Sequence, residues 1–472
     1  MMFDLIVATT VCGGIALAGR FPWSPGLAAR RDMQWFVKRT MSAGVVIMGR
    51  VTWDSIPAKF KPLNRRKTIV ITRTICNGSP PENDSRLHVF YEKSFDRALR
   101  LAKILNPCGV PIICGGAQIY SIALKHPQLR YCYVTIISGD YDHDLEFPDY
   151  DTLSSMSYDL RTNALEDDPN QYRRYDMRNH DEMAYIGLLK KLRACGVPTP
   201  DRTSVGEAFV LVGQQLRFRL TDEKGCRILP LLTTKRVNLR GIVNELAWFL
   251  RGDTDVKFLQ ERDTRIWDGN TTREALDGRG LTQAEPGHVG PIYGWQWRNW
   301  GGDQIKQLIE GLRADPFGRR HVVSAWNVDM LPQMALPPCH LMFQMVAVCR
   351  PRGSQPDAHH LSCIVTMRSA DTFLGVPWNI ASYAILTHAI AKLVDMRADE
   401  LIINMGNCHL YANHIEQAVL QSSRTARRFP LFDFDSRLAT IDDFATMTVS
   451  DIIIDTARHY LPHPAISGEL AV

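Results

Sequence analysis

Residues 337–340 read Pro-Pro-Cys-His, and residues 375–383 read Gly-Val-Pro-Trp-Asn-Ile-Ala-Ser-Tyr. Polar motifs lie around these two stretches, namely Arg319-Arg320, Arg368-Ser369-Ala370-Asp371 and His409-Leu410-Tyr411. A cysteine in an apolar stretch is usually a buried structural thiol, because free cysteine is among the most buried residue types. Arginines in the nearby motifs favour a different interpretation here, since positive charge lowers the pKa of a thiol and produces a nucleophilic thiolate.

The order and spacing of these motifs resemble the thymidylate synthase family, from about Tyr185 to Val472. The resemblance implies an enzyme that methylates dUMP to dTMP with methylenetetrahydrofolate as cosubstrate. Methylation requires that the aromaticity of uracil is first broken, and a thiolate that attacks carbon six turns carbon five into a nucleophile. Cys339 is the expected thiolate, and the resemblance adds Glu245, Tyr293 and Asp371 as catalytic residues.

Glu245 lies within the apolar segment Ile242–Leu250, which is an unusual place for a carboxylate. A buried carboxylate must be paired or protonated. The resemblance implies a general acid or base that passes protons to uracil through water, and a structural ion pair is the alternative. Tyr293 is expected to assist removal of the proton on carbon five.

The phosphate of dUMP is a dianion, which planar guanidinium groups bind well. The resemblance assigns dUMP binding to Arg202, Arg319, Arg320, Arg368, Ser369, Asn379, His409 and Tyr411. It places the arginine pair in the site of a partner subunit, so we expect a homodimer formed through the synthase domain. Without the other motifs, that pair would indicate a solvated surface patch. The synthase folate is expected at Trp267, Asp371 and Val472.

Asn379 offers both a donor and an acceptor to the edge of uracil, so cytosine would leave buried polar groups unpaired. A helix N-terminal cap is the alternative interpretation of this asparagine. His409 and Tyr411 are two residues apart on an expected strand. Their side chains therefore point to one face, where they are expected to bind the ribose hydroxyl.

A second motif lies near the start of the chain, where residues 32–40 read Asp-Met-Gln-Trp-Phe-Val-Lys-Arg-Thr between Pro22-Trp23 and Val46–Arg50. This pattern resembles dihydrofolate reductase and covers most of the first 178 residues. The resemblance implies reduction of dihydrofolate with NADPH, and it makes Asp32 the carboxylate that grips the pterin and supports its protonation. A helix cap is the alternative for Asp32.

The resemblance also implies which residues line the reductase site. Folate-binding positions are Ala8, Asp32, Phe36, Leu63, Arg66, Cys114 and Thr135. Positions expected to bind NADPH are Arg50, Thr52, Thr72, Arg73, Gly115, Gly116 and Tyr120. A basic residue after the strand that ends near Thr72 favours NADPH over NADH.

Several positions depart from the two family patterns. Met367 stands in place of glutamine, Trp378 in place of phenylalanine, and Asn407-Cys408 in place of an acidic and a small residue. Cys408 is expected to place a second thiol near the nucleotide, where it is a candidate for oxidation. The loop Ala16–Phe21 has alanine where glycine is usual and arginine where an acidic or neutral residue is common. None of these changes removes a residue that makes or breaks bonds.

Short apolar runs alternate with helical patterns in the first part of the chain, which predicts an α/β domain with a mostly parallel twisted sheet and flanking helices. The expected strands are Phe3–Ala8, Val45–Met48, Thr68–Thr72, Leu87–Phe90, Val110–Cys114, Tyr131–Ile137 and Gln171–Met177, and the expected helices are Arg31–Met41 and Phe95–Leu105. An α+β domain follows, with a helix at His180–Leu192, a strand at Ala208–Leu220 and helices at Leu239–Leu250 and Trp378–Val394. We expect domains at 1–178 and 185–472, joined by a short junction at 179–184.

The composition agrees with an ordinary globular protein, since 45% of the 472 residues are hydrophobic and 22% are charged. A net charge of +5 is small for this length and argues against general nucleic-acid binding. Eleven cysteines lie scattered without a Cys-x-x-Cys pair, so neither a metal site nor a disulfide framework is expected. No apolar run approaches the length of a membrane span, and the cytoplasm is the expected location.

Two other functions fit parts of this pattern. A pyrimidine hydroxymethylase shares the thiolate attack but lets water capture the methylene group, and Asn379 argues against its cytosine form. Alternatively, one domain serves only as a dimerising or RNA-binding scaffold. The retained cysteine and carboxylates favour an enzyme with two active domains.

Overall fold

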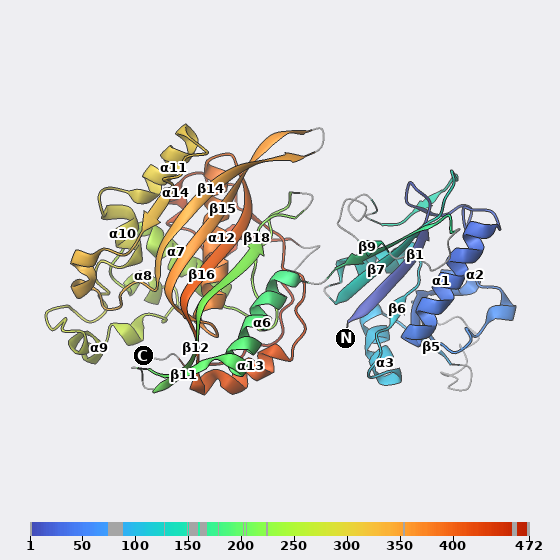
Figure 1. Ribbon diagram of the computed structural model, residues 1–472, viewed down its shortest axis with the longest axis horizontal. Coiled ribbons are helices and arrows are strands. Elements are labelled where there is room, and N and C mark those ends of the chain that lie inside the picture. The colour runs from blue at the N-terminus through green and yellow to red at the C-terminus, as the bar shows by residue number, and fades with distance from the viewer. Residues whose placement is uncertain are drawn as a thin grey trace. The chain divides into compact units, whose positions relative to one another are not determined.

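The computed structural model describes residues 2–73, 88–126, 128–148, 150, 159–160, 168–177, 179–201, 203, 205–222, 225–352, 355–455 and 460–469. The chain divides into two compact units, Met1–Arg178 and Asn179–Val472, which we call the N-terminal and C-terminal units (Figure 1). Helix α6 (His180–Cys195) opens the second unit, and the side chain of Asn179 caps it by accepting the backbone N–H of Glu182. Residues 179–184, the expected junction, are the cap and first residues of this helix, and its start at His180 agrees with the expected helix His180–Leu192.

The N-terminal unit is built on an eight-stranded sheet with the order β5-β4-β3-β6-β1-β7-β10-β9. The strands are β1 (Phe3–Thr9), β3 (Val45–Gly49), β4 (Lys67–Ile71), β5 (Val89–Glu92), β6 (Ile112–Ile113), β7 (Leu129–Ile136), β9 (Asp159–Leu160) and β10 (Gln171–Asp176). All pairs from β5 to β7 are parallel, and β10 runs antiparallel to both β7 and β9. The expected mostly parallel α/β sheet is confirmed.

Helices cover both faces of this sheet, as is usual for a parallel sheet. They are α1 (Leu27–Ala43), α2 (Arg50–Ser55), α3 (Phe95–Leu105) and α4 (Ala117–Lys125). Alternate strand residues build two apolar clusters, one with α3 and α4 through Leu99 and Ile119, and one with α1 and α2 through Trp35 and Trp53. The strands β2 (Gly14–Ala16) and β8 (Leu145–Glu146) form a separate two-stranded antiparallel sheet. A short 3-10 helix, η1, spans Ala58–Phe60.

The C-terminal unit contains a six-stranded sheet with the order β11-β12-β16-β15-β14-β13. The strands are β11 (Val197–Pro200), β12 (Glu207–Arg219), β13 (Val322–Ser324), β14 (His340–Arg352), β15 (Gln355–Asp371) and β16 (Arg397–Tyr411). Only the pair β15 and β16 is parallel. Because β15 and β16 end side by side, the residues at their carboxyl ends are brought to one place.

The other elements of this unit are mostly helices, and several pack together with the inner face of the sheet into one core. They are α7 (Leu239–Arg251), α8 (Lys257–Gln260), α9 (Arg273–Gly278), α10 (Tyr293–Asn299), α11 (Gln304–Ala314), α12 (Gly375–Leu393), α13 (Ile415–Ser422) and α14 (Ile441–Phe444), with η2 (Asp268–Asn270), η3 (Val328–Gln333), η4 (Ala412–His414), η5 (Val449–Asp451) and the pair β17 (Phe432–Phe434) and β18 (Ile452–Ile454). The expected α+β architecture is confirmed.

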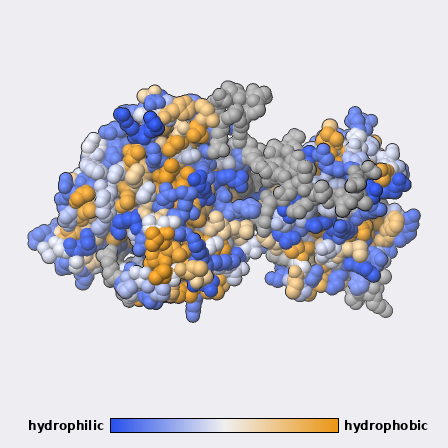
Figure 2. Space-filling model, viewed as in Figure 1, coloured by the Kyte–Doolittle hydropathy of each residue, from blue (hydrophilic) through white to orange (hydrophobic). Residues whose placement is uncertain are grey.

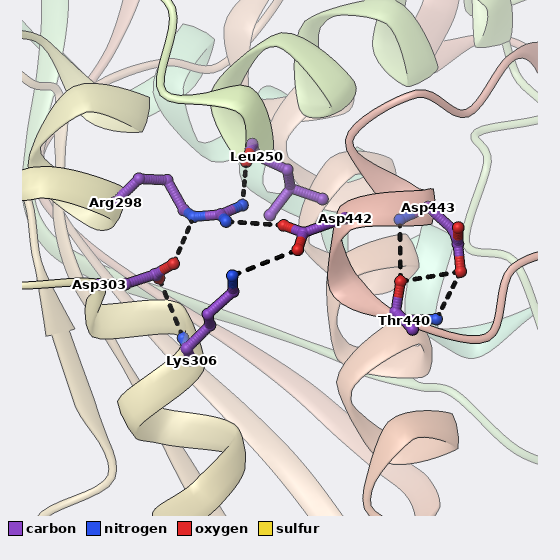
Figure 3. A network of polar contacts seen from close by, with 7 residues as sticks. All are labelled: Leu250, Arg298, Asp303, Lys306, Thr440, Asp442 and Asp443. Carbon is purple, nitrogen blue, oxygen red and sulfur yellow. Dashed lines mark hydrogen bonds and ion pairs between the residues drawn. The ribbon is translucent and has the colours of Figure 1, made fainter.

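Two features of the C-terminal unit hold its helices in place. Helix α12 is buried on nearly every side, which fixes the position of each residue on it. Arg298 of α10 donates to the carbonyl of Leu250 at the end of α7, to Asp303 at 2.9 Å and to Asp442 of α14 at 2.8 Å (Figure 3). One guanidinium group thus connects the ends of three helices and the cap of α11, where Asp303 accepts the N–H of Lys306.

The face of the six-stranded sheet that points away from the helical core is only partly covered. Core residues such as Met345 and Val365 alternate along β14 and β15 with partly exposed residues such as Val346 and Ile364. Figure 2 shows apolar residues gathered over these strands. Among the described residues, no helix is long and apolar enough to span a membrane.

Candidate active sites

Cys339 immediately precedes β14 and lies beside Arg368 of the neighbouring strand β15. The Arg368 guanidinium donates to the carbonyl of Pro337 at 2.7 Å and to that of Pro338 at 2.9 Å. Its Nη2 lies 3.9 Å from the sulfur of Cys339. The backbone of Arg368 also donates to the Cys339 carbonyl at 2.8 Å, so the positive charge is fixed next to a partly exposed thiol.

Tyr293, at the start of α10, contacts the same cysteine. The backbone N–H of Cys339 donates to the Tyr293 hydroxyl at 2.7 Å. The Tyr293 ring stacks on His340 with a centroid distance of 3.9 Å, and His340 Nδ1 lies 2.7 Å from the hydroxyl of Tyr383. Burial raises the pKa of Tyr293, and the charge of Cys339 adds to that effect. Burial lowers the pKa of His340 to about 3, so this imidazole is neutral near pH 7.

Glu245 lies on α7 with only 7% of its surface exposed. Each carboxylate oxygen accepts one indole N–H, from Trp267 at 2.9 Å and from Trp378 at 2.6 Å. Burial raises the pKa of Glu245 to about 7, although both hydrogen bonds oppose the rise. Among the described residues, the hydrogen-bond partners of this carboxylate are two neutral indoles and it forms no ion pair, which argues against the alternative of a structural ion pair. A carboxyl group with this pKa can both accept and release a proton near neutral pH.

Asp371 and His409 are brought together by the parallel pairing of β15 and β16, in which they are direct partners. Asp371 Oδ1 accepts the backbone N–H groups of Phe373 at 2.9 Å and Leu374 at 3.1 Å, which shapes the turn into α12. His409 lies 3.0 Å from Asn407 through Nδ1, and its ring meets that of Tyr411 at 5.0 Å. Burial lowers the pKa of His409.

Asn379 lies inside α12, which begins at Gly375. It therefore does not cap that helix, and the alternative interpretation is wrong. In the described part of the chain its side-chain amide makes no hydrogen bond, and the side chain is partly exposed. Ser369 is partly exposed as well. Both remain free for a ligand.

No contact between described residues of the chain joins Arg319 or Arg320 to the residues around Cys339. Arg319 and Arg320 are exposed in the segment before β13, and neither side chain forms an ion pair with a described residue of the same chain. Two further positions expected to bind ligands, Arg202 and Val472, are outside the described residues. The structure therefore connects Cys339 and Arg368 directly, and it leaves the arginine pair without an intrachain role.

Two of the residues that depart from the family pattern, Cys408 and Met367, are buried. Cys408 is fully buried and contacts the Thr372 hydroxyl at 3.2 Å, and burial raises its pKa to about 11. A thiol in this environment reacts slowly, so the expectation that Cys408 is a candidate for oxidation is not supported. Met367 is buried in the apolar core, which accounts for an apolar side chain at that position.

Sequence reasoning missed two polar groups in this region. Lys235 is buried, donates to the carbonyl of Phe373 and lies 3.6 Å from the centre of its ring. Burial lowers the pKa of Lys235 to about 7. Trp378 was identified only as a departure, and its bond to Glu245 was not foreseen. The available signal for Lys235 was a polar run, Thr233-Thr234-Lys235, directly after apolar residues.

In the N-terminal unit, Asp32 lies on the second turn of α1, which begins at Leu27. The helix-cap alternative is therefore wrong. Burial raises the pKa of Asp32 to about 6, while the Thr135 hydroxyl opposes the rise. That hydroxyl is fully buried and has no partner with ordinary hydrogen-bond geometry among the described residues. Thr135 of β7 pairs with Ala8 of β1, which places both expected folate-binding positions side by side.

The other expected folate-binding residues also gather around α1. Leu63 belongs to the apolar cluster of Trp35, and Phe36 and Cys114 pack against it. Arg66 donates to the Thr40 hydroxyl at 2.8 Å, and that hydroxyl donates to the Phe36 carbonyl at 2.7 Å. Arg66 is thus fixed to the same helix that carries Asp32.

Residues expected to bind the reduced nicotinamide cofactor meet at the start of α4. Gly115 has φ +128°, and a Cβ on Gly115 or Gly116 would lie 3.2 or 3.0 Å from the hydroxyl of Thr52. Gly116 caps α4 without a side-chain bond, which leaves first-turn N–H groups available for an anion. The Tyr120 hydroxyl is occupied, since it donates to the Ile6 carbonyl at 2.8 Å.

Other residues expected to bind the cofactor, and the unusual loop Ala16–Phe21, lie in exposed or partly exposed segments. Arg50 is exposed and pairs with Asp54 at 2.9 Å, and Arg73 is exposed. The Thr72 backbone donates to Glu92. The loop Ala16–Phe21 is mainly exposed and turns through Ala18 and Gly19, which both have positive φ.

The folds and sites define a two-domain enzyme, with a pterin-type reductase site in one unit and a pyrimidine-methylating site in the other. Residues 183–472 match the thymidylate synthase family, and residues 2–179 match the dihydrofolate reductase family. The chain is similar to the bifunctional dihydrofolate reductase-thymidylate synthase of Leishmania major, with 35% identity covering 100% of this chain and 95% of the relative. The enzymes of the same description from Plasmodium berghei and Arabidopsis thaliana are 32% and 33% identical, covering 90% and 100% of this chain and 82% and 88% of the relatives.

The chain belongs to the bifunctional dihydrofolate reductase-thymidylate synthase family. Thymidylate synthase and dihydrofolate reductase activities follow from that membership. NADPH is the cofactor of the reductase family, and methylenetetrahydrofolate is the cosubstrate of the synthase family.

Proposed function

We propose that the C-terminal unit makes dTMP from dUMP and methylenetetrahydrofolate, and that the N-terminal unit reduces the resulting dihydrofolate with NADPH, through the residues assigned below. The observation that carries the proposal is the group formed by Cys339, Arg368, Tyr293 and Glu245. It combines a partly exposed thiol, a fixed positive charge and a carboxyl group with a pKa of about 7. These are the groups that pyrimidine activation requires.

Cys339 is the nucleophile in this proposal. Its sulfur attacks carbon six of uracil, and Arg368 Nη2 lies 3.9 Å from that sulfur. Glu245 exchanges a proton with the uracil carbonyl through water, and its pKa of about 7 suits both directions. Tyr293, held by its bond to the Cys339 backbone, assists removal of the proton on carbon five.

Binding of dUMP follows from the remaining polar groups. The side-chain amide of Asn379 forms no hydrogen bond to a described residue and can pair with both a carbonyl and an N–H of uracil. His409 and Tyr411 bind the ribose hydroxyl. Ser369 contacts the phosphate together with Arg368, whose bonds to described residues use Nε and Nη2. Arg202 adds a further charge to the phosphate. Asp371 and Trp267 orient the folate, and Val472 closes over it.

The proposed homodimer completes this site. Arg319 and Arg320 are exposed and unpaired within the described part of their own chain, as expected of groups that reach a partner's phosphate. The partly apolar outer face of the six-stranded sheet, with Val346, Ile364 and Ile402, supports a contact between two sheets.

Asp32 provides the proton for the reductase reaction. Its pKa of about 6 allows protonation near neutral pH, and the Thr135 hydroxyl stabilises its charged form. Phe36 follows Asp32 by one turn on α1, and Arg66 is bound to Thr40 of the same helix. Arg66 pairs with the carboxylate of the folate tail. NADPH, when bound, supplies the hydride. The backbone at Gly115 and Gly116 carries no side chain beside Thr52 and begins α4, which fits a phosphate-bearing cofactor. The other residues assigned to NADPH are Arg50, Thr72, Arg73 and Tyr120.

A reducing compartment such as the cytoplasm is part of the proposal. Eight cysteines of the described residues are free thiols, which is usual for proteins kept under reducing conditions; they are Cys12, Cys108, Cys114, Cys195, Cys339, Cys349, Cys363 and Cys408.

A coupled assay tests both activities together. Purified protein receives dUMP, methylenetetrahydrofolate and NADPH, and the formation of dTMP and the oxidation of NADPH are followed separately. We expect NADPH oxidation to follow dTMP formation with equal amounts. Formation of dTMP without NADPH oxidation would contradict the coupling. The mass of the product distinguishes methylation from hydroxymethylation, since a hydroxymethyl product is heavier by one oxygen.

A further inference from the structure

Trp378 and Glu245 are separated by 133 positions in the chain but share a hydrogen bond of 2.6 Å. The bond joins α12 to α7. Trp267 supplies the second indole, which binds the other carboxylate oxygen at 2.9 Å. Two donors on two different oxygens fix the plane of a carboxylate, whereas a single donor leaves it free to rotate about that bond.

Gly241, one turn before Glu245 on α7, makes room for this arrangement. A Cβ at position 241 would lie 2.5 Å from Cη2 and 3.2 Å from Cζ2 of Trp378. Both atoms belong to the six-membered part of the indole, which extends beyond the reach of a phenylalanine ring. Glycine at 241 therefore fits the larger side chain at 378, and the two positions form a matched pair.

We propose that Trp378 is a positioning residue for the synthase reaction, because it holds the second oxygen of Glu245 while Gly241 provides the space for its ring. Trp378 also directly precedes Asn379 on α12. The same helix turn thus orients the proposed proton carrier and carries the proposed uracil-binding amide. The catalytic part of this inference rests on the proposed role of Glu245.

Among the described residues, the buried titratable groups around Glu245 are Tyr293 on α10, Tyr383 on α12 and His340 on β14, which contacts both tyrosines. These three groups are neutral near pH 7, and the charged guanidinium of Arg368 beside Cys339 is the same in every variant that is compared. Burial raises the pKa of both tyrosines, and burial lowers the pKa of His340 to about 3. A change in the titration of Glu245 after substitution of Trp378 would therefore report the lost indole N–H rather than a neighbouring charge.

Trp378→Phe is the central variant, since it removes the N–H and keeps an aromatic ring. The carboxyl band of Glu245 is followed by infrared difference spectroscopy against pH, with the Glu245→Gln variant used to identify it. We expect the midpoint to rise by about one pH unit, because a hydrogen bond to the charged form is lost. We expect kcat for dTMP formation to fall about tenfold while KM for dUMP changes little.

Trp248→Phe is the matched control. Trp248 lies in the same aromatic cluster, 5.8 Å from Trp267, but its indole donates to the Asp255 carbonyl at 2.8 Å. We expect no change of the Glu245 midpoint in this variant. An equal shift in both variants, or an unchanged midpoint in Trp378→Phe, would overturn the inference.

Gly241→Ala tests the matched pair by a second route. The added methyl group should displace the indole and raise the midpoint in the parent protein, but have little effect in the Trp378→Phe background. Equal effects in both backgrounds would contradict the fit between Gly241 and Trp378. The titration needs no turnover, so it separates this inference from the proposed synthase function, whose failure would show as no dTMP formation by the parent protein.

Discussion

The hydroxyl of Tyr293 accepts the backbone N–H of Cys339 at 2.7 Å, so the phenol and the thiol are held in fixed positions relative to each other. The bond leaves the phenol proton available to a second acceptor. A tyrosine held in this way can take part in proton transfer beside the sulfur without being bonded to the sulfur itself.

Tyr293→Phe should therefore lower kcat for dTMP formation by roughly 100-fold, because proton transfer and the hydrogen bond to Cys339 are both lost. KM for dUMP should change by no more than a few-fold. Tyr383→Phe removes a phenol from the same cluster, where it contacts His340 rather than Cys339, and should cost less than tenfold. Steady-state kinetics of both variants test this prediction. Equal losses of kcat in the two variants would argue that only packing is affected.

The reductase activity should depend on pH through Asp32. The pKa of this carboxyl group is raised to about 6, mainly by burial, so the proton-donating form is lost as the pH rises above that value. Dihydrofolate reduction at saturating substrate should fall up to tenfold per pH unit in that range. Asp32→Asn should be slower by at least about 100-fold at pH 7 and should lack this inflection. Asp140→Asn alters an exposed carboxylate and should keep the parental profile.

If the two sites of the proposed homodimer share residues, two inactive proteins should recover activity when they exchange subunits. Arg319→Ala lacks the charge that is proposed to reach the partner's site, and Cys339→Ser lacks the proposed nucleophile. A mixed dimer contains one site with both groups intact and one site with neither. Random exchange should restore about a quarter of the parental dTMP formation, measured at low dUMP concentration. If activity stays absent although mixed dimers are detected, the arginine does not act across subunits.

The polar network around Arg298 should be a stability element rather than part of either site (Figure 3). Arg298→Met leaves the Leu250 carbonyl and Asp303 without their partner, and the arginine side chain is only 12% exposed. The free energy of unfolding of the C-terminal unit should fall by about 2–3 kcal/mol. Lys306→Met removes an ion pair with Asp442, and the Lys306 side chain is 49% exposed. This variant should lower the free energy of unfolding by at most about 0.5 kcal/mol. Denaturant titration measures both, and similar values would contradict this view.

Local sequence patterns predicted much of the fold because each pattern acts over a few residues. The helix expected at Leu239–Leu250 is found at Leu239–Arg251, since its apolar face and its flanking Asn238 cap and Gly252 define both ends. The strand expected at Val110–Cys114 shrinks to Ile112–Ile113, because Pro111 has no N–H to pair. Helix α1 begins four residues earlier than expected, at Leu27, directly after Pro25-Gly26.

The site was less accessible to sequence reasoning, because its decisive contacts join distant parts of the chain. The cysteine, the arginine and the carboxylate were identified by their motifs, and their roles stay predictions. The bond between Trp378 and Glu245 depends on how α12 packs against α7, and no local pattern contains that information. The burial of Cys408 and Lys235 likewise follows from packing of the whole unit.

The central claim is that the sulfur of Cys339 forms a covalent bond to carbon six of the pyrimidine. Incubation with 5-fluoro-dUMP and methylenetetrahydrofolate tests it, because fluorine at carbon five cannot leave as a proton would and the adduct is trapped. Mass spectrometry of the digested protein should find nucleotide and folate on the peptide that contains Cys339. The adduct should be absent in Cys339→Ser and present in Cys408→Ser. An adduct on another residue, or none in the active parent protein, would contradict the account.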